Sequence, residues 1–306
     1  MPLLTLFSAP KPFTDPHIAV IQRNAIQSWL RLPEVEVLLL GDEAGLAQVA
    51  AEFGVKHLPE VSRNSSGTPL ISSMLSLARQ NSESSLLGIV NADILLLPDL
   101  VDSTRRLAAC CERFVLLGRR WDLDVSEPLD FANGWQFRLR ERVRKEGQLH
   151  RPVGSDYFVF PRACYADIPD FAIGRAGWDN WMIYKARREG WPTVDGTHDI
   201  IAIHQTHEYR HLPGGIPHYT LPETNENIRL AGGQSNIRYT ILDCTHRLVD
   251  ARLVRPRMTS ERFLRQVELF LRAVFFFLPE NVVENLVRPK RWQKRFKKLL
   301  KRSKVV

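Results

Sequence analysis

Short apolar runs alternate with helix-like runs along the first 120 residues, and this alternation restricts the fold more than any other feature of the sequence. The runs at 3–8, 35–40, 86–90 and 114–117 have the length and apolar character of buried strands. Between the first two, residues 15–30 place large apolar side chains near one face at helical spacing. Strands that alternate with helices predict βαβ units and a mostly parallel central sheet flanked by helices, an α/β fold.

The pattern changes near Arg255-Pro256, and this change predicts two parts of the chain. Residues 1–255 mix strands, helices and loops and are expected to form the α/β domain. Residues 256–306 have a helical pattern and many basic side chains, so we expect a helical, basic C-terminal tail.

Cysteine usage and the apolar segments indicate where the protein works. The four cysteines form no C-x-x-C pair, which is typical of a reducing compartment and of a chain without disulfides or structural zinc. The N-terminus, MPLLTLFSAPKPF, lacks the features of a signal peptide, and the apolar run 269–278 is too short to span a bilayer. The sequence predicts a cytoplasmic protein, or one peripheral on the inner face of the membrane.

The excess of positive charge favours anionic partners. The net charge is +8 and the sequence pI is about 9.5, with a dense basic run at 288–304 that includes interleaved apolar residues. Such a run predicts an amphipathic basic helix on an anionic membrane surface. A solvated helix is the alternative, and nucleic-acid binding is disfavoured because no known module is present.

The strongest local signal is the polar triplet Asn91-Ala92-Asp93, which interrupts the apolar run 86–97. A buried carboxylate is costly unless it is paired or binds a metal. Asp93, at the end of a strand, is therefore a candidate ligand for a divalent metal, Mn²⁺ or Mg²⁺, that bridges a diphosphate. The alternative is an ordinary turn, which Asn and Asp favour.

Histidines follow a later strand. His204 comes directly after an apolar run, and imidazole is a good ligand for Mn²⁺ or Zn²⁺. A zinc site built from His204, His207 and His211 is an alternative, although no H-E-x-x-H motif is present. We expect His204 to bind the metal, and His207 and His211 to be ordinary loop histidines.

Two acidic residues are candidates for the general base. Asp179 lies between Trp178 and Trp181, whose rings suit the apolar faces of a sugar acceptor, and burial makes a carboxylate more basic. The alternative is an N-cap aspartate with both tryptophans in the core. Asp156 is the rival base, and its neighbour Tyr157 belongs to an aromatic strand that is expected to line the same acceptor pocket.

Residues 118–124 follow another strand and are candidates for binding a donor. Arg119 and Arg120 are suited to holding phosphates in bidentate geometry, Trp121 to stacking on a sugar or base, and Asp122 to binding sugar hydroxyls. The alternative is a salt-bridged surface loop.

Topology adds four weaker donor-binding candidates. Ser8 ends the first strand, and Arg63, Asn64 and Thr68 precede a predicted helix. Thr68 is the predicted N-cap of that helix, whose N-terminus would attract phosphate.

An apolar strand, the Asn91-Ala92-Asp93 triplet and a second apolar run together resemble the GT-A glycosyltransferases. The resemblance implies a Rossmann-like, nucleotide-sugar-binding domain with a divalent metal at the triplet, where Asn91 takes the first acidic position and Asp93 the last. His204 is similar to a late histidine that supplies a further metal ligand in that family. Gly177-Trp178-Asp179 resembles part of a motif of inverting members, which implies that Asp179 is the general base.

An ordered series of segments extends this resemblance over roughly residues 3–210. It is similar to that of a bacterial or plant-type glycosyltransferase-like family: TLFSAPKPF, NADILLLPD, GRRWDLD, DYFVFPR, GRAGWDNW and AIHQ. The resemblance implies transfer of a sugar from a nucleotide-diphosphate sugar to a hydroxyl of an unknown glycan, lipid-linked or small-molecule acceptor.

Two other functions stay open. A non-catalytic nucleotide-sugar or carbohydrate-binding protein is one, because Asn91 is uncharged where the resemblance implies an acid. A sugar nucleotidyltransferase is less favoured, because residues 8–12, SAPKP, lack a glycine-rich phosphate loop.

Overall fold

The computed structural model describes residues 1–207, 221–275, 278 and 282 of the 306-residue chain. The chain divides into two compact units, Met1–Pro256 and Arg257–Val306.

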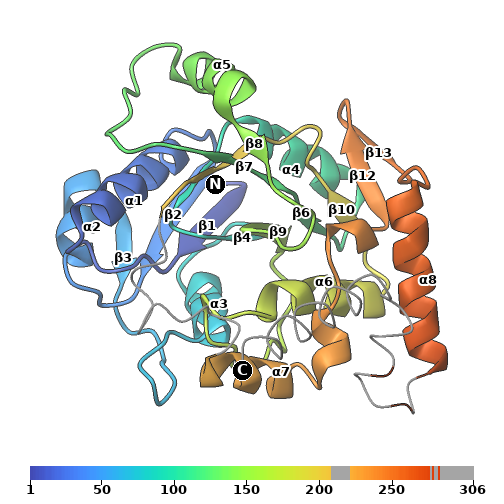
Figure 1. Cartoon of the computed structure of the whole chain (residues 1–306). Coiled ribbons are helices and arrows are strands. Elements are labelled where there is room, and N and C mark those ends of the chain that lie inside the picture. The colour runs from blue at the N-terminus through green and yellow to red at the C-terminus, as the bar shows by residue number, and fades with distance from the viewer. Residues whose placement is uncertain (208–220, 276–277, 279–281, 283–306) are drawn as a thin grey trace, which may run out of the picture. The chain divides into compact units, whose positions relative to one another are not determined.

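The first unit is built on a nine-stranded sheet with the order β13-β12-β10-β6-β9-β4-β1-β2-β3 (Figure 1). Its strands are parallel except that β9 runs antiparallel to β4 and β6, and β13 runs antiparallel to β12. The predicted mostly parallel sheet is therefore confirmed. The strands are β1 (Leu4–Ser8), β2 (Val35–Leu40), β3 (Lys56–Leu58), β4 (Leu86–Val90), β6 (Val115–Leu117), β9 (Tyr157–Pro161), β10 (Thr193–Asp195), β12 (His246–Val249) and β13 (Arg252–Val254).

Helices cover both faces of this sheet (Figure 1). Those in the first unit are α1 (Pro16–Trp29), α2 (Leu46–Phe53), α3 (Ile71–Gln80), α4 (Asp99–Cys110), α5 (Trp135–Glu146), α6 (Trp178–Arg188) and α7 (Pro222–Leu230). The prediction of helices that flank the sheet is also confirmed.

Successive residues of each central strand point to opposite faces and so build two separate cores. In β1, Leu6 packs with α1, α2 and α4, whereas Phe7 packs with α3 and α6. The same alternation separates Leu39 from Leu38 in β2. A sheet buried on both faces explains why these strands read as continuous apolar runs.

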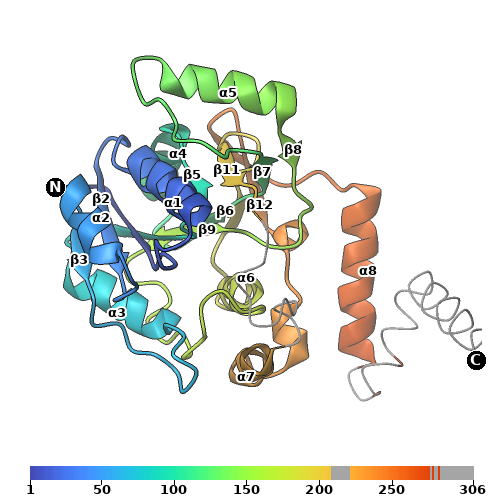
Figure 2. The same cartoon turned by 60° about the vertical axis from the view of Figure 1, so that its left-hand side comes forward.

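A smaller sheet, in the order β5-β11-β7-β8, lies beyond the carboxyl end of β4. Helix α5 crosses over it (Figure 2), and Trp135, Leu139 and Val143 of α5 form a third core with its strands. The strands are β5 (Ile94–Leu95), β7 (Arg120–Leu123), β8 (Gln148–Leu149) and β11 (Ala202–Gln205). This sheet gathers segments that are far apart in the sequence.

One predicted helix start is wrong. Helix α3 begins at Ile71 with Leu70 at the N-cap position, so Thr68 does not cap it. The Thr68 hydroxyl instead donates to Glu223 Oε1 at 2.5 Å, and its backbone N–H donates to Asn64 Oδ1. An Asx-type turn at Asn64 therefore takes the place of the predicted cap.

The second unit contains helix α8 (Ser260–Val274). Its N-cap is Thr259, whose hydroxyl accepts a hydrogen bond from the N–H of Arg262 at 3.2 Å. No helix in the described part of the chain is long and apolar enough to cross a membrane.

Candidate metal centre

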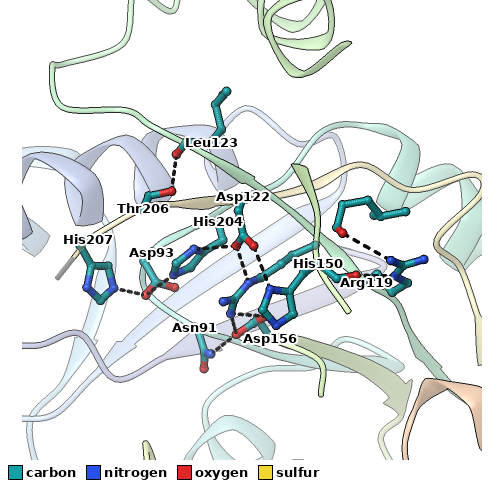
Figure 3. Close-up of polar contacts among 12 residues, drawn as sticks. Asn91, Asp93, Arg119, Asp122, Leu123, His150, Asp156, His204, Thr206 and His207 are labelled. Atoms are coloured by element: carbon teal, nitrogen blue, oxygen red, sulfur yellow. Dashed lines mark hydrogen bonds and ion pairs between the residues drawn. The ribbon is translucent and has the colours of Figure 1, made fainter. Parts of the chain in front are cut away.

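The polar triplet after β4 meets the end of β11. Asp93 precedes β5, and the antiparallel pairing of β5 with β11 sets His204 opposite Ile94, the residue after Asp93. His207 follows β11 and turns its ring toward the same carboxylate (Figure 3). Asp93, His204 and His207 are called the Asp93 group here.

The three side chains of the Asp93 group lie close enough to share one ion. Their potential ligand atoms are all within 4.8 Å of one another. Nε2 of His207 is 2.9 Å from Asp93 Oδ2, and Nε2 of His204 is 3.6 Å from the same oxygen. The other carboxylate oxygen, Oδ1, is buried and has no hydrogen-bond partner among the residues that the structure describes. A buried oxygen without a partner is costly, so it marks a position that a ligand would stabilise.

The electrostatics of the group favour an ionised carboxylate. Burial alone would raise the pKa of Asp93, but its contacts with His204 and His207 bring that pKa well below its usual range. The positive charge of Lys11 acts in the same direction. An ionised carboxylate and two imidazoles are a donor set that suits Mn²⁺, whereas Mg²⁺ prefers oxygen ligands alone. The residues therefore fit a divalent transition metal.

Asn91 is turned away from the Asp93 group. Its Nδ2 donates to Asp156 Oδ1 at 2.9 Å, and its backbone N–H donates to the carbonyl of Asp156 (Figure 3). The structure therefore places this expected ligand with the second candidate base instead.

A second cluster, called the Arg120 network, consists of Arg120 and four residues that Figure 3 labels: Asp122, Asp156, Asn91 and His150. Nη1 of Arg120 donates to both oxygens of Asp156 at 2.9 Å, and its Nε donates to Asp122 Oδ1 at 2.9 Å. Nδ1 of His150 lies 2.8 Å from the other oxygen of Asp122. Every carboxylate oxygen in this network thus has a partner.

These contacts determine the charges of the network. Burial lowers the pKa of the Arg120 guanidinium, but the charges of Asp156 and Asp122 raise it by more than burial lowers it. The pKa is therefore above its ordinary value. Burial raises the pKa of Asp122, and the contacts with His150 and Arg120 lower it below its ordinary value. Nδ1 of His204 approaches Asp122 Oδ1 at 3.1 Å and so joins the network to the Asp93 group.

The two arginines predicted to hold phosphates are both engaged within the protein. Arg120 is neutralised by two carboxylates. Arg119 donates through Nε to the carbonyl of His150 at 2.6 Å and through Nη2 to that of Leu149 at 3.4 Å. Trp121 packs against the core beneath α5. The salt-bridged alternative describes Arg120 and Asp122 better than donor binding does.

Asp179 has a different environment from Asp156. It lies in the first turn of α6, and burial together with the nearby charge of Asp156 raises its pKa to about 6. Its own backbone neighbours, including the N–H of Asn180, moderate the rise. A Cβ added at Gly154 would lie 2.8 Å from Asp179 Oδ2, so the carboxylate lies close against the backbone of Gly154.

The aromatic residues predicted to contact an acceptor belong to the core. Trp178 and Trp181 are 5% and 6% exposed, and they pack against Phe158 and Phe171 respectively. Tyr157 is fully buried as well, and its hydroxyl has no hydrogen-bond partner. The alternative in which the tryptophans are core residues describes their placement, so they do not form an exposed wall for a sugar.

The four topological candidates are also occupied. The Ser8 hydroxyl donates to the carbonyl of Val90 at 2.7 Å and ties β1 to β4. Arg63 pairs with Asp42 and Glu43. Asn64 and Thr68 both donate to Glu223, which also pairs with Arg175 at 2.6 Å. None of these contacts involves the Asp93 group.

Two residues of the site were not predicted. His207 was expected to be an ordinary loop histidine, yet it makes the shortest contact with Asp93 in the group. The signal was its position three residues after His204 at a strand end. Lys11 follows β1 at the carboxyl edge of the sheet, where the rule for parallel sheets would have selected it. His211 and the basic run 288–304 lie outside the described residues.

Comparisons with known proteins give distant structural similarity. No protein-family model matches the sequence, and no curated protein sequence matches it. Mannosyltransferase PcManGT from Pyrobaculum calidifontis, solved with GDP-Man and Mn²⁺, is 12% identical, with a TM-score of 0.46, over 68% of this chain and 58% of that chain. The chain therefore covers less than two thirds of that protein's length.

Two further solved structures are similar to this chain. S. aureus TarS 1–349, solved with UDP-GlcNAc, is 13% identical, with a TM-score of 0.47, over 90% of this chain and 73% of that chain. Glucosyl-3-phosphoglycerate synthase from Mycobacterium tuberculosis, solved with Mn²⁺, UDP and phosphoglyceric acid, is 15% identical, with a TM-score of 0.43, over 67% of this chain and 72% of that chain. These similarities are distant, so the function has to be argued from the site itself.

Proposed function

We propose that this chain is a glycosyltransferase that moves a sugar from a nucleotide-diphosphate sugar to an acceptor hydroxyl, with a divalent metal held by the Asp93 group. The observation that carries the proposal is the partly buried Asp93 carboxylate, which lies beside two imidazoles and whose buried Oδ1 has no hydrogen-bond partner among the described residues. Its position at the carboxyl edge of a parallel sheet is where nucleotide ligands bind in such folds. The sequence resemblance to GT-A enzymes points to the same site.

Asp93, His204 and His207 would hold the metal, and Asp122 would orient the ring of His204 through its Nδ1. When bound there, a divalent ion would supply positive charge for the diphosphate leaving group. Asn91 would act indirectly in this arrangement, because its amide fixes Asp156.

Asp179 is the better candidate for the general base. Its pKa of about 6 means that it is largely ionised at neutral pH yet basic enough to accept a proton from an acceptor hydroxyl. Both carboxylate oxygens of Asp156 already accept hydrogen bonds from Arg120 or Asn91, so they are engaged within the protein. This assignment applies to an inverting enzyme; in a retaining enzyme Asp179 would have no such role.

Metal removal tests the proposal directly. The purified full chain is treated with a chelator and assayed for nucleotide binding by thermal shift, and for sugar transfer or donor hydrolysis, before and after Mn²⁺ is restored. We expect UDP or GDP to raise the melting temperature only when Mn²⁺ is present, because a ligand that binds the native state stabilises it.

The outcomes separate the three functions. Release of nucleoside diphosphate from a nucleotide sugar in the presence of Mn²⁺ supports a transferase. Nucleotide-sugar binding without hydrolysis or transfer, across a wide panel of acceptors, supports a binding protein. Pyrophosphate release from a nucleoside triphosphate supports a nucleotidyltransferase.

The second unit supports a separate proposal about location, namely that it binds an anionic membrane surface. Residues 257–306 contain 14 Lys and Arg and 4 Asp and Glu, a net charge of +10, whereas the whole chain has +8, so the remaining residues carry −2. Along α8, Phe263, Leu264, Phe270 and Val274 share one face and are exposed. Apolar side chains beside basic charge suit the interface of an anionic bilayer.

Flotation with vesicles that contain phosphatidylserine tests this location. The double variant Phe263→Glu/Phe270→Glu should reduce binding at least about tenfold, since two large apolar side chains no longer enter the interface. Phe137→Glu is the matched control, because Phe137 is as exposed as the other two but belongs to α5 in the first unit. Equal flotation of all three proteins would contradict the proposal.

A further inference from the structure

Lys11 is a cation near the Asp93 group that has no anionic partner in the described part of the chain. Among the described residues, no carboxylate lies within 4.0 Å of its ammonium, although the charge of Asp93 acts on it. Lys11 is half-buried, and burial lowers the pKa of its ammonium while the charge of Asp93 opposes that shift. The arginines that the sequence nominated for phosphate binding, Arg119 and Arg120, are both engaged elsewhere.

The backbone of Lys11 is held in place by a single buried side chain. Gln22 of α1 accepts a hydrogen bond from the N–H of Lys11 at 2.6 Å and donates to its carbonyl at 2.9 Å. Gln22 is 2% exposed, and Pro10 and Pro12 flank the lysine on both sides. The prolines restrict the backbone dihedral angles on either side of Lys11. The side-chain amide of Gln22, which pairs with both the N–H and the carbonyl of Lys11, then fixes the position of its backbone.

The two loops that carry Lys11 and Asp93 leave the same edge of the sheet. Strands β1 and β4 are parallel neighbours, and the hydroxyl of Ser8 at the end of β1 donates to the carbonyl of Val90 at the end of β4. Lys11 is three residues beyond Ser8, and Asp93 is three residues beyond Val90. The topology of the sheet therefore places Lys11 at the same carboxyl edge as Asp93.

Charge balance indicates what this cation is for. A divalent ion beside one carboxylate and one ammonium leaves two positive charges uncompensated, and Lys11 would be repelled unless an anion lay between it and the metal. The diphosphate of a nucleotide sugar carries two negative charges and would meet this requirement. We propose that Lys11 binds the diphosphate of the nucleotide donor, the role that Arg119 and Arg120 do not fill. The inference rests on the proposed metal-dependent use of a nucleotide-diphosphate donor.

Binding measurements on the full chain test this role without relying on activity. The variants are Lys11→Met and Lys11→Arg, with Lys145→Met as a control because Lys145 is an exposed residue of α5. Isothermal titration calorimetry gives the affinity for Mn²⁺ alone, and then for UDP, GDP, uridine and guanosine in the presence of Mn²⁺.

The inference predicts that loss of the Lys11 charge weakens the binding of nucleoside diphosphates but does not weaken the binding of Mn²⁺ alone. Lys11→Met should weaken UDP or GDP binding about 10- to 100-fold, because a charged hydrogen bond to phosphate is lost, and should leave nucleoside binding unchanged. The same variant should bind Mn²⁺ alone as tightly as the wild type or a few times more tightly, since a nearby positive charge has been removed. Lys11→Arg should retain most of the diphosphate affinity, and Lys145→Met all of it.

Other outcomes overturn the inference in distinguishable ways. If Lys11→Met weakens Mn²⁺, nucleosides and diphosphates alike, Lys11 supports the local fold and does not bind phosphate. If the wild type binds UDP or GDP and Lys11→Met binds them equally well, the role of Lys11 is refuted while the proposed function stands. If the wild type binds neither diphosphate with Mn²⁺ present, both proposals are refuted.

Discussion

The Asp93 group and the Arg120 network lie side by side, joined by the contact of His204 with Asp122, but they differ in how completely their polar atoms are satisfied (Figure 3). Each carboxylate oxygen of Asp122 and Asp156 has a hydrogen-bonding or ionic partner. The Oδ1 oxygen of Asp93 is buried and has no such partner within the described ranges of the chain. A network whose polar atoms all have partners rigidifies the local structure, whereas a buried polar atom without a partner can still accept a ligand. We therefore assign ligand binding to Asp93, and stabilisation of the surrounding structure to Arg120 and its carboxylate partners.

The largest effect is expected from a substitution in the Asp93 group, where metal binding should be lost. Asp93→Asn should weaken Mn²⁺ binding by more than about 100-fold and reduce sugar transfer at least as much, since changes to the partners of metal ligands alone cost about 10- to 100-fold. Calorimetric titration with Mn²⁺ measures the first effect, and nucleotide release measures the second. Asp102→Asn, an exposed substitution on α4, is the control and should leave both unchanged.

Breaking the closed side should affect stability more than metal binding. Arg120→Met leaves Asp122 and Asp156 without their shared cation, and the loss of these partly buried charged hydrogen bonds should cost about 1.5 to 3 kcal/mol of the free energy of unfolding. Arg138→Met, which breaks the exposed pair with Asp130, should cost less than about 1 kcal/mol. Urea denaturation gives both values. Equal losses in the two variants would show that the network is not the support that the contacts indicate.

Asp179 adds a pH dependence opposite in sign to that expected from Asp93 and Asp122, whose pKa values are lowered. Its folded-state pKa of about 6 is above the ordinary value of 3.8, so the folded protein binds more protons than the unfolded chain between these two pH values. The contribution of Asp179 to the free energy of unfolding is therefore greatest below about pH 4 and falls by about 3 kcal/mol as the pH rises past 6.

Asp179→Asn should make the stability less dependent on pH in that window. Urea denaturation at pH 4 and pH 7 measures the difference for each protein, with Asp130→Asn as the exposed control. Some dependence should remain in Asp179→Asn, because burial also raises the pKa of Asp99 to about 6. An unchanged difference between the two pH values would contradict the buried environment assigned to Asp179.

The smallest effect is expected from Asn91→Asp. It tests whether Asn91 is a metal ligand, as the resemblance to GT-A enzymes implies, or a partner of Asp156, as in the structure. If Asn91 were a metal ligand, Asn91→Asp would restore the acidic position and tighten Mn²⁺ binding. In the structure the Asn91 amide donates to Asp156, so the substitution loses a hydrogen bond and sets two carboxylates together. We expect no gain in Mn²⁺ affinity and a loss of about 1 to 2 kcal/mol in the free energy of unfolding. Tighter Mn²⁺ binding would place Asn91 in the Asp93 group after all.

The sequence predicted the sheet better than it predicted the site. Apolar runs and helical spacing are local features, and they were enough to give the parallel strands and the helices around them. The polar triplet and His204 were also recognisable, because both follow apolar strands. Their meeting depends on the antiparallel pairing of β5 with β11, which no local pattern encodes.

The errors arose where a partner is distant in sequence. Arg120 is neutralised by Asp156, which is 36 positions away, and Thr68 is bound by Glu223, which is 155 positions away. Local composition made both residues candidates for phosphate binding, and tertiary contacts removed them. Trp178 and Trp181 show the same limit, because an aromatic cluster reads alike in a core and in a sugar site until its neighbours are known.

The central claim is that Asp93, His204 and His207 bind one divalent metal, and electron paramagnetic resonance of bound Mn²⁺ tests it most directly. We expect the wild type to bind one Mn²⁺ whose spin-echo signal shows coupling to imidazole nitrogen. His207→Ala should weaken that binding by at least about tenfold and reduce the nitrogen coupling, whereas His17→Ala, in the first turn of α1, should change neither. Mn²⁺ binding without nitrogen coupling, or equal binding by wild type and His207→Ala, would contradict the account.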